Sequence, residues 1–359
     1  MQSDIATSVA SALKAGVFGQ SIEAMDKPPN GNLAAYDAML QGRYYAERRT
    51  RLDYVKAEQY YQRAIQLDPD YALAYARLAI VEQWFNDWEA TSDERKVVSA
   101  RARAHAHMAV ALAPRSATAL GALGVTQAWL DFNFAAAETT LKKAVALDPS
   151  NAETLYQLAD VTAARGRVEE AIGMMRKALT MEPLNGTFHF YTGQFLSAAG
   201  QYVESEKESR RALELQPGAD GFGAQLALSL VGQGKFDEAL AAAKVDPDEM
   251  DRLQALAVTW YARGDKAKAR SILDEMIRKD AGDGPGLVAL VYGYEGDLDQ
   301  AFAWLDRAIA ARDTSVTTLY EAPINLQPLI KDPRIAAFCR KVGLPTPDEV
   351  RRSIAQGPE

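Results

Sequence analysis

The chain has 359 residues but only one cysteine, Cys339, and only three histidines. A single cysteine excludes an intramolecular disulfide and any metal site built from several cysteines. Lysine and arginine (40) are also fewer than aspartate and glutamate (48), so the formal net charge is −8 at pH 7. Nucleic-acid binding needs clustered basic residues, and this composition therefore predicts no nucleic-acid partner.

Long hydrophobic runs are missing as well. No stretch approaches the roughly 18 uncharged apolar residues of a membrane-spanning helix, so we expect no membrane insertion. The first residues lack the continuous apolar segment of a signal peptide. Ile5, Val9 and Leu13 instead follow a helical period and predict a short amphipathic helix, with a linker behind it. We expect residues 1–31 to end a preceding segment, and a cytoplasmic location, or a periplasmic one if a transmembrane helix precedes residue 1.

Motifs that carry catalytic chemistry are absent too. The sequence has no G-x-S-x-G or H-E-x-x-H motif. His105 and His107 would point about 200° apart on a helix and could not share a metal ion. Cys339 has no base partner in the sequence and is best interpreted as a small buried hydrophobe. We therefore predict that the chain is not an enzyme and has no catalytic residue, metal or cofactor.

What the sequence does contain is an internal repeat. The phrase Ala-x-x-x-apolar-x-x-Ala, closed by Asp-Pro or Glu-Pro, recurs at residues 137–149 and 171–183. Alanines seven residues apart share one helix face and let two helices approach closely, while a proline ends the second helix. The closing prolines are separated by 35, 34 and 34 residues: Pro114, Pro149, Pro183 and Pro217. The pattern predicts consecutive two-helix hairpins with glycine in the turn between the helices.

Residues 32–312 resemble the tetratricopeptide repeat family, whose period is 34 residues. The resemblance implies an all-α fold, a right-handed superhelical solenoid of about eight helical hairpins, because one hairpin cannot bury its own apolar face. Residues 313–345 should form a C-terminal cap, and residues 346–359 a tail outside the core. The hairpins are expected at residues 33–69, 70–114, 115–149, 150–183, 184–217, 218–246, 249–280 and 283–312.

Three hairpins depart from the regular pattern. The second has about a third of a repeat extra, around residues 84–93, which predicts either longer helices or a projecting loop. The first has a smaller insertion, residues 46–51, which is basic in an otherwise acidic protein. The sixth should have a truncated second helix, because Val245-Asp-Pro-Asp248 interrupts it.

The two ends of the array resemble a narrower group, bacterial signalling regulators with C-terminal tetratricopeptide arrays. Residues 36–50 look like the first repeat of that group, and residues 301–345 look like its last. In that group the array follows an adenylate or guanylate cyclase domain, a winged-helix domain or a kinase. Residues 4–13 look like the last helix of the TolB-like segment that often intervenes. The resemblance implies that this chain is the regulatory part of a longer bacterial protein.

The first helix of each hairpin lines the concave groove in this family. An aromatic groove with scattered polar groups suits an extended peptide or a partner helix. Packing between hairpins explains each of these side chains equally well. The Lys and Asn with which chaperone-binding members hold a terminal carboxylate are absent from the corresponding positions, which disfavours that mode. The groove candidates are Tyr36, Arg43, Trp84, Trp129, Tyr156, Asp160, Phe190, Gln194, Tyr261 and Tyr294, with Met39 and Val125 on the same face.

Two functions remain open from the sequence. The preferred one is a non-catalytic scaffolding module that binds a protein or peptide partner in its groove. The alternative is a regulatory module that senses a small ligand or self-associates, as a homodimer for example, with Trp84 and Trp88 as the contact.

Overall fold

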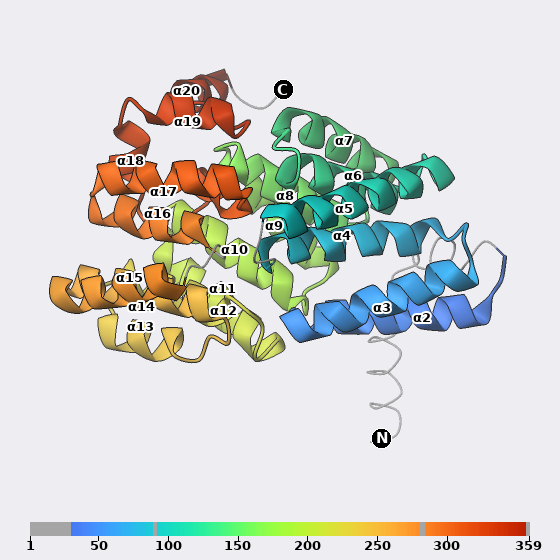
Figure 1. Cartoon of the computed structure of the whole chain (residues 1–359), viewed down its shortest axis with the longest axis horizontal. Coiled ribbons are helices and arrows are strands. Elements are labelled where there is room, and N and C mark those ends of the chain that lie inside the picture. Colours follow the sequence, from blue (N-terminus) through green and yellow to red (C-terminus); the bar gives the residue numbers. More distant parts are fainter. Residues whose placement is uncertain (1–29, 89–91, 280–283, 357–359) are drawn as a thin grey trace, which may run out of the picture.

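The computed structural model describes residues 30–88, 92–279 and 284–356. These residues are helices joined by short turns and include no β-strand (Figure 1). The predicted all-α class is therefore confirmed. The amphipathic helix predicted for residues 4–13 lies outside the described residues.

Helices α2 to α17 form eight successive antiparallel pairs, each packed on the next. They are α2 (Leu33–Ala46) with α3 (Arg51–Leu67), α4 (Ala72–Trp88) with α5 (Ser92–Leu112), α6 (Ala117–Trp129) with α7 (Phe134–Leu147), α8 (Ala152–Ala164) with α9 (Val168–Met181), α10 (Gly186–Ala198) with α11 (Tyr202–Leu215), α12 (Phe222–Val231) with α13 (Phe236–Ala243), α14 (Glu249–Arg263) with α15 (Lys266–Lys279) and α16 (Pro285–Glu295) with α17 (Leu298–Ala311). A 3-10 helix, η1 (Thr314–Tyr320), and the helices α18 (Gln327–Lys331), α19 (Ile335–Lys341) and α20 (Pro347–Gln356) follow.

Local sequence sets where these helices begin and how they pair. The side chain of Asn151 caps α8 by accepting the Thr154 N–H at 3.0 Å, and Asn185 caps α10 in the same way. The small residues Ala171 and Ala178 of α9 are completely buried, which allows close helix packing. Each hairpin thus buries one face against its neighbours, and the hairpins stack into a solenoid.

Two of the irregular hairpins have the helix lengths that their sequences predict. The extra residues of the second hairpin lengthen its helices, since α4 has 17 residues and α5 has 21, against 13 and 14 for α8 and α9. Of the two alternatives for this insertion, longer helices are what the structure shows. The second helix of the sixth hairpin, α13, has only eight residues, as its interrupted sequence predicts.

The superhelix curls until distant hairpins touch (Figure 1). The loop between α2 and α3 reaches the loop that follows α11, where the Asp220 N–H donates to the Arg49 carbonyl and the Gln216 side chain donates to the Glu47 carbonyl. On α5, Arg95 donates to the carbonyl of Ala311, which ends α17, at 3.0 Å. These contacts, between residues up to 216 positions apart, surround the space inside the solenoid.

The C-terminal segment differs from the sequence-based expectation. Residues 347–356, expected as a tail outside the core, form α20, and the Val350 side chain is buried against Gly166 in the turn between α8 and α9. An apolar valine in the middle of an amphipathic helix can dock wherever a glycine leaves room. The superhelical path that brings this turn within reach is not encoded near residue 350.

The contribution of this docking to the free energy of unfolding can be measured by replacing Gly166 with alanine. Gly166 has φ +83°, and an added Cβ would lie 2.7 Å from a Val350 methyl group, whereas Gly200 has φ +76° and open space around it. We expect Gly200→Ala to lower the free energy of unfolding by about 1 kcal/mol through backbone strain alone. Gly166→Ala should cost about 1 kcal/mol more because of the clash. Urea unfolding measures both, and in a Val350→Ala background the two costs should become equal.

Candidate binding cavity

A cavity of about 1580 Å³ fills the inside of the curled solenoid. The first helix of every hairpin contributes to its wall, from α2 to α16, as expected for the concave face of a solenoid. The loops that lead into α8, α10, α12 and α14 add to the wall, and so do the loop between α2 and α3 and the segment around η1. The contacts that curl the superhelix therefore turn an open groove into a partly enclosed site.

Seven of the ten candidate residues line this cavity: Arg43, Trp84, Trp129, Tyr156, Asp160, Phe190 and Gln194. Val125 lines it too, whereas Met39 is buried in the core of the first hairpin. Helical register therefore predicted which faces of α4, α6, α8 and α10 line the cavity. Whether these residues bind a partner remains a prediction.

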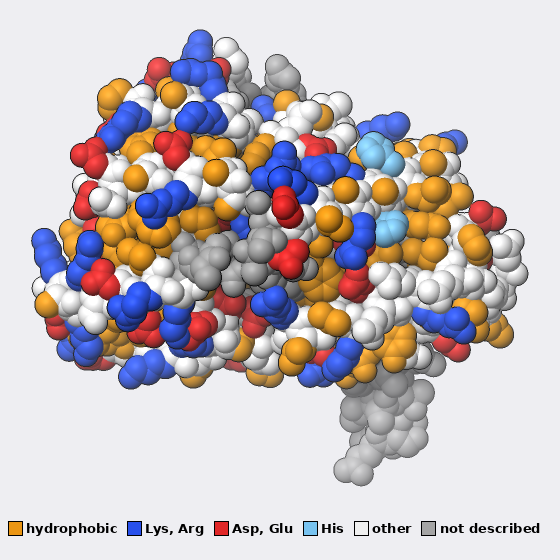
Figure 2. Space-filling model, in the orientation of Figure 1, with side chains coloured by type: hydrophobic (Ala, Val, Ile, Leu, Met, Phe, Trp, Pro, Cys, Tyr) orange, Lys and Arg blue, Asp and Glu red, His pale blue; other side chains and the backbone are white. Residues whose placement is uncertain are grey.

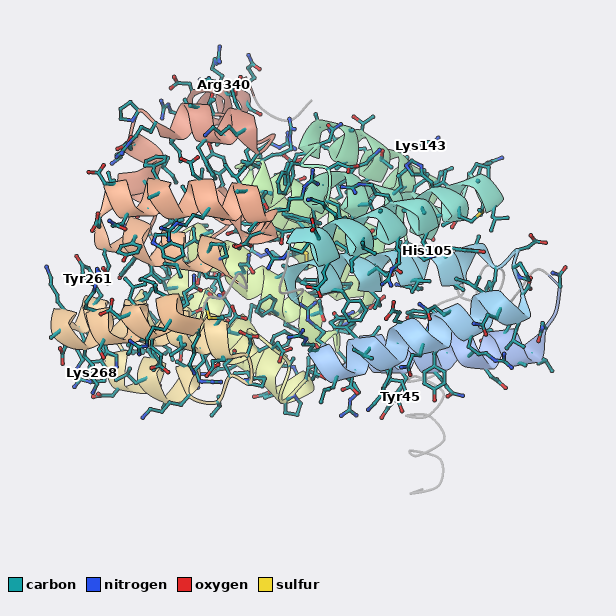
Figure 3. All side chains as sticks on the ribbon, viewed as in Figure 1. Tyr45, His105, Lys143, Tyr261, Lys268 and Arg340 are labelled. Carbon is teal, nitrogen blue, oxygen red and sulfur yellow. The ribbon has the colours of Figure 1, made fainter. Side chains whose placement is uncertain are left out.

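The other three candidates lie elsewhere. Tyr36 packs on the core of the first hairpin, seven residues or about 10 Å before Arg43 along α2. Tyr261 and Tyr294 are near the C-terminal ends of α14 and α16, where their rings contact each other at 5.9 Å and the Tyr261 hydroxyl donates to the Glu295 carbonyl. Figure 3 shows Tyr261 at the outer part of the molecule. The cavity touches only the N-terminal halves of these two helices, and register alone cannot reveal that.

Aromatic rings of α8 and α10 form a wall of the cavity, and the fully buried Phe222 of α12 packs against it. The Tyr156 ring lies 4.7 Å from Tyr191 and 5.6 Å from Phe188, centroid to centroid. Phe190 stacks on Phe222 at 4.6 Å with nearly parallel rings. Such a wall offers a large apolar area with little side-chain entropy to lose on binding.

Arg49, on the loop between α2 and α3, places its guanidinium among these rings. Its Cζ is 4.9 Å from the Trp84 ring centroid, 5.7 Å from that of Tyr191, 5.8 Å from Phe190 and 5.9 Å from Phe222. These are cation–π distances. Its backbone has φ +54°, a left-handed conformation that a residue with a Cβ rarely adopts. The loop is held in this conformation by the contacts that it makes across the cavity.

Acidic groups dominate the polar lining. Ten carboxyl groups but only four guanidinium groups line the cavity. Burial raises the pKa of Asp160 to about 7, although Arg49 opposes the shift. Burial and the charges of Asp248 and Asp246 raise the pKa of Asp220 to about 6. Burial, and secondarily the charge of Asp160, raises the pKa of Glu321 well above its ordinary value.

Sequence reasoning missed the residues that come from loops. Arg49 belongs to the basic insertion at residues 46–51, which was the one available signal for it. Asp220 and Glu321 carried no signal, because each reaches the cavity from a segment between or beyond the regular hairpins. Only the superhelical path brings these segments together.

His105, His189 and Cys339 make local contacts. His105 lies on α5 (Figure 3) with its Nδ1 2.6 Å from the buried Glu82 carboxylate, and His189 pairs with Glu208 at the same distance. The Cys339 thiol is buried, which raises its pKa to about 11, so it is protonated at neutral pH. Among residues 30–88, 92–279 and 284–356, no group of three or more His, Cys, Asp or Glu side chains could hold a metal ion. None of the helices in these ranges is both long and apolar enough to cross a membrane.

Comparison with known families identifies the repeats. Residues 128–185 and 225–284 each match a family described as tetratricopeptide repeat. These two stretches are tetratricopeptide repeats. The first spans the end of α6 to the start of α10, and the second spans α12 to α15, so the tetratricopeptide hairpins form much of the cavity wall.

Solved structures agree with a tetratricopeptide solenoid. A human IFIT1 dimer with m7Gppp-AAAA superposes with a TM-score of 0.54 at 15% identity, covering 72% of this chain and 68% of that chain. A monomeric IFIT1 mutant with Gppp-AAAA gives a TM-score of 0.55 at 15% identity, covering 71% of this chain and 67% of that chain. This level of identity shows the fold alone. No curated protein matches the sequence.

Proposed function

We propose that this chain is a non-catalytic interaction module that binds an extended segment of a protein partner inside its central cavity. The observation that carries the proposal is the cavity itself, about 1580 Å³, which is lined by residues of all eight first helices and has aromatic rings on α4, α6, α8 and α10. Small-molecule pockets are typically about 300–1,000 Å³. The larger volume and the length of the lining favour a peptide segment over a small ligand.

The charge of the lining argues against a nucleic acid as this ligand. The four guanidinium groups are outnumbered by ten carboxyl groups and provide few cations to hold the phosphates of an oligonucleotide such as that in the IFIT1 structures. On the face drawn in Figure 2, basic and acidic side chains are interspersed rather than gathered into a basic field. A peptide, and especially a cationic one, fits this electrostatic environment better.

The proposal includes a regulatory role. The resemblance of both ends to bacterial signalling regulators supports a place next to a cyclase, winged-helix or kinase domain of a longer, cytoplasmic protein. Partner capture in the cavity would then be coupled to that domain through the solenoid.

The alternative role, self-association through the insertion of the second hairpin, finds less support. The Trp84 ring lies inside the cavity, 6.2 Å from the Tyr54 ring and under Arg49. It is therefore not displayed on a convex surface where a second copy could reach it.

A peptide-library selection tests the proposal. We expect selected peptides to lose at least tenfold in affinity when Gln194→Trp fills part of the cavity, and when Tyr156→Ala removes part of its aromatic wall. Lys143→Ala, at an exposed position on α7 (Figure 3), is the matched control and should change nothing. Selected peptides that bind both cavity variants as well as the original chain would show that the cavity is not the binding site.

A further inference from the structure

The first hairpin has an apolar face that the described residues leave uncovered. Its first helix, α2, lies at the edge of the array and packs mainly on α3 (Figure 1). Leu33 and Tyr44 of this helix are 76% and 58% exposed, although both are largely apolar. Leu40, between them, is only partly buried. The spacings of seven and four residues place the three side chains on one face of the helix. We call Leu33, Leu40 and Tyr44 the α2 face.

In the inner hairpins the same face is buried against the hairpin that comes before. Gly42 of α2 packs on α3 as Gly124 of α6 packs on α7, so the two helices align at these glycines. Leu40 then corresponds to Ala122, which belongs to a buried cluster of alanines from α4, α5 and α6. Among the described residues no hairpin precedes α2, and a solenoid needs a cap over an apolar end.

A segment ahead of α2 has the sequence pattern of such a cap. Residues 5–17 repeat apolar side chains at helical spacing and keep polar ones on the other side. Ile5, Val9 and Leu13 are four residues apart, and rows with this spacing are the ridges with which helices most often pack. The apolar side of the segment consists of Ile5, Ala6, Val9, Ala10, Leu13 and Val17.

The position at which the chain enters α2 places this segment within reach. Asn30 donates to the Asp68 carboxylate at 2.8 Å, and Asn32 caps α2 directly ahead of Leu33. Residues 18–29 extend to about 40 Å at most, at about 3.3 Å per residue. Helix α2 has 14 residues and is therefore about 21 Å long, so the segment reaches the whole α2 face.

We propose that residues 5–17 form a helix that docks on the α2 face and caps the first hairpin. In the antiparallel direction the end of this helix lies beside Leu33, where the chain enters α2. Lys14 then comes close to the exposed carboxylate of Asp37, which lies one turn after Leu33 on α2. The inference goes beyond what the cavity binds, and the docked helix also supports the hairpin whose loop brings Arg49 into the cavity.

Hydrogen exchange of the full chain tests the proposal, with mass spectrometry of peptides from residues 5–17 as the readout. Val9→Asp places a charge on the apolar side of the segment, and Ser11→Asp on its polar side is the matched control. Leu33→Asp places a charge on the α2 face, and its control is Val203→Asp, at a 71% exposed valine in the first turn of α11. Aspartate in a first turn is favourable for a helix, so neither α2 nor α11 should unfold.

We expect Val9→Asp and Leu33→Asp to speed exchange in residues 5–17 at least about tenfold, because each forfeits the burial of an apolar side chain. Ser11→Asp and Val203→Asp should leave the exchange unchanged. Lys14→Asp and Asp37→Lys should each speed it, and the double variant should restore part of the protection.

Three results would overturn the proposal. Equally fast exchange in the original chain and in Val9→Asp would mean that the segment is not docked. Faster exchange in Val9→Asp but not in Leu33→Asp would place the segment on another surface. A dimer of the original chain, detected by light scattering, that Leu33→Asp converts to a monomer would mean that a second copy covers the α2 face. A double variant that exchanges as fast as Lys14→Asp alone would overturn the antiparallel direction.

Discussion

Arg49→Ala should lower the free energy of unfolding by about 3 kcal/mol at pH 8, the largest effect that we expect from a single substitution in a loop. The guanidinium contacts four aromatic rings and is the cation that opposes the buried charge of Asp160. Its removal loses the cation–π contacts and leaves buried carboxylates without compensation. The backbone carbonyl of residue 49, which accepts the Asp220 N–H, is retained in this variant, so the loss reports on the side chain.

Two companion variants separate the causes of this effect. Arg48→Ala removes the neighbouring arginine, whose solvent-exposed guanidinium pairs with Asp53 and should contribute little to stability. Arg49→Gly should be about 1 kcal/mol more stable than Arg49→Ala, because glycine adopts the φ of +54° without strain. Urea unfolding at pH 8 measures all three. Equal losses for Arg48→Ala and Arg49→Ala would mean that the aromatic and acidic surroundings of Arg49 contribute nothing to stability.

The stability of the chain should fall as pH rises from 5 to 8. Asp160 and Asp220 have pKa values of about 7 and about 6 in the folded state, raised from an ordinary value of 3.8, chiefly by burial. Between pH 4 and 7 the folded chain therefore holds more protons than the unfolded chain, and the free energy of unfolding decreases with pH. The stabilisation is complete below pH 4 and is lost as pH rises through the folded-state values.

Asp160→Asn should remove much of this pH dependence. A pKa raised from 3.8 to about 7 corresponds to about 4 kcal/mol between the two ends of the range, as an upper figure for this group. The groups that face Asp160 are Arg49, Glu321, Tyr156 and Tyr191. Thermal unfolding midpoints of the original chain, Asp160→Asn and the exposed control Asp37→Asn, taken from pH 5 to 8, make the comparison. If the unfolding midpoints of Asp160→Asn and Asp37→Asn changed equally with pH, a group other than Asp160 would be responsible for the pH dependence.

The predictions for Arg49→Ala and for Asp160→Asn concern the same buried pair of opposite charges. Arg49→Ala should cost less at pH 5 than at pH 8, because the carboxyl groups that it compensates are then protonated.

Local sequence patterns account for the repeat and for most of the hairpin architecture. Alanine pairs such as Ala171 and Ala178, the closing prolines and the turn glycines fix hairpin length, and helical register selects the inward faces that carry Tyr156, Asp160 and Phe190. These are local properties, because each depends on residues within about one repeat of 34. The truncated α13 was predicted for the same reason.

Which residues line the space inside the solenoid depends on how distant hairpins are placed relative to one another. Small rotations between successive hairpins accumulate along the array, and their sum determines that Arg49 meets Phe222, that Glu321 joins Asp160 and that Val350 docks on Gly166. The same sum leaves Tyr261 and Tyr294 beyond the end of the cavity. No local pattern encodes an accumulated rotation, so these contacts between distant residues could not be read from the sequence.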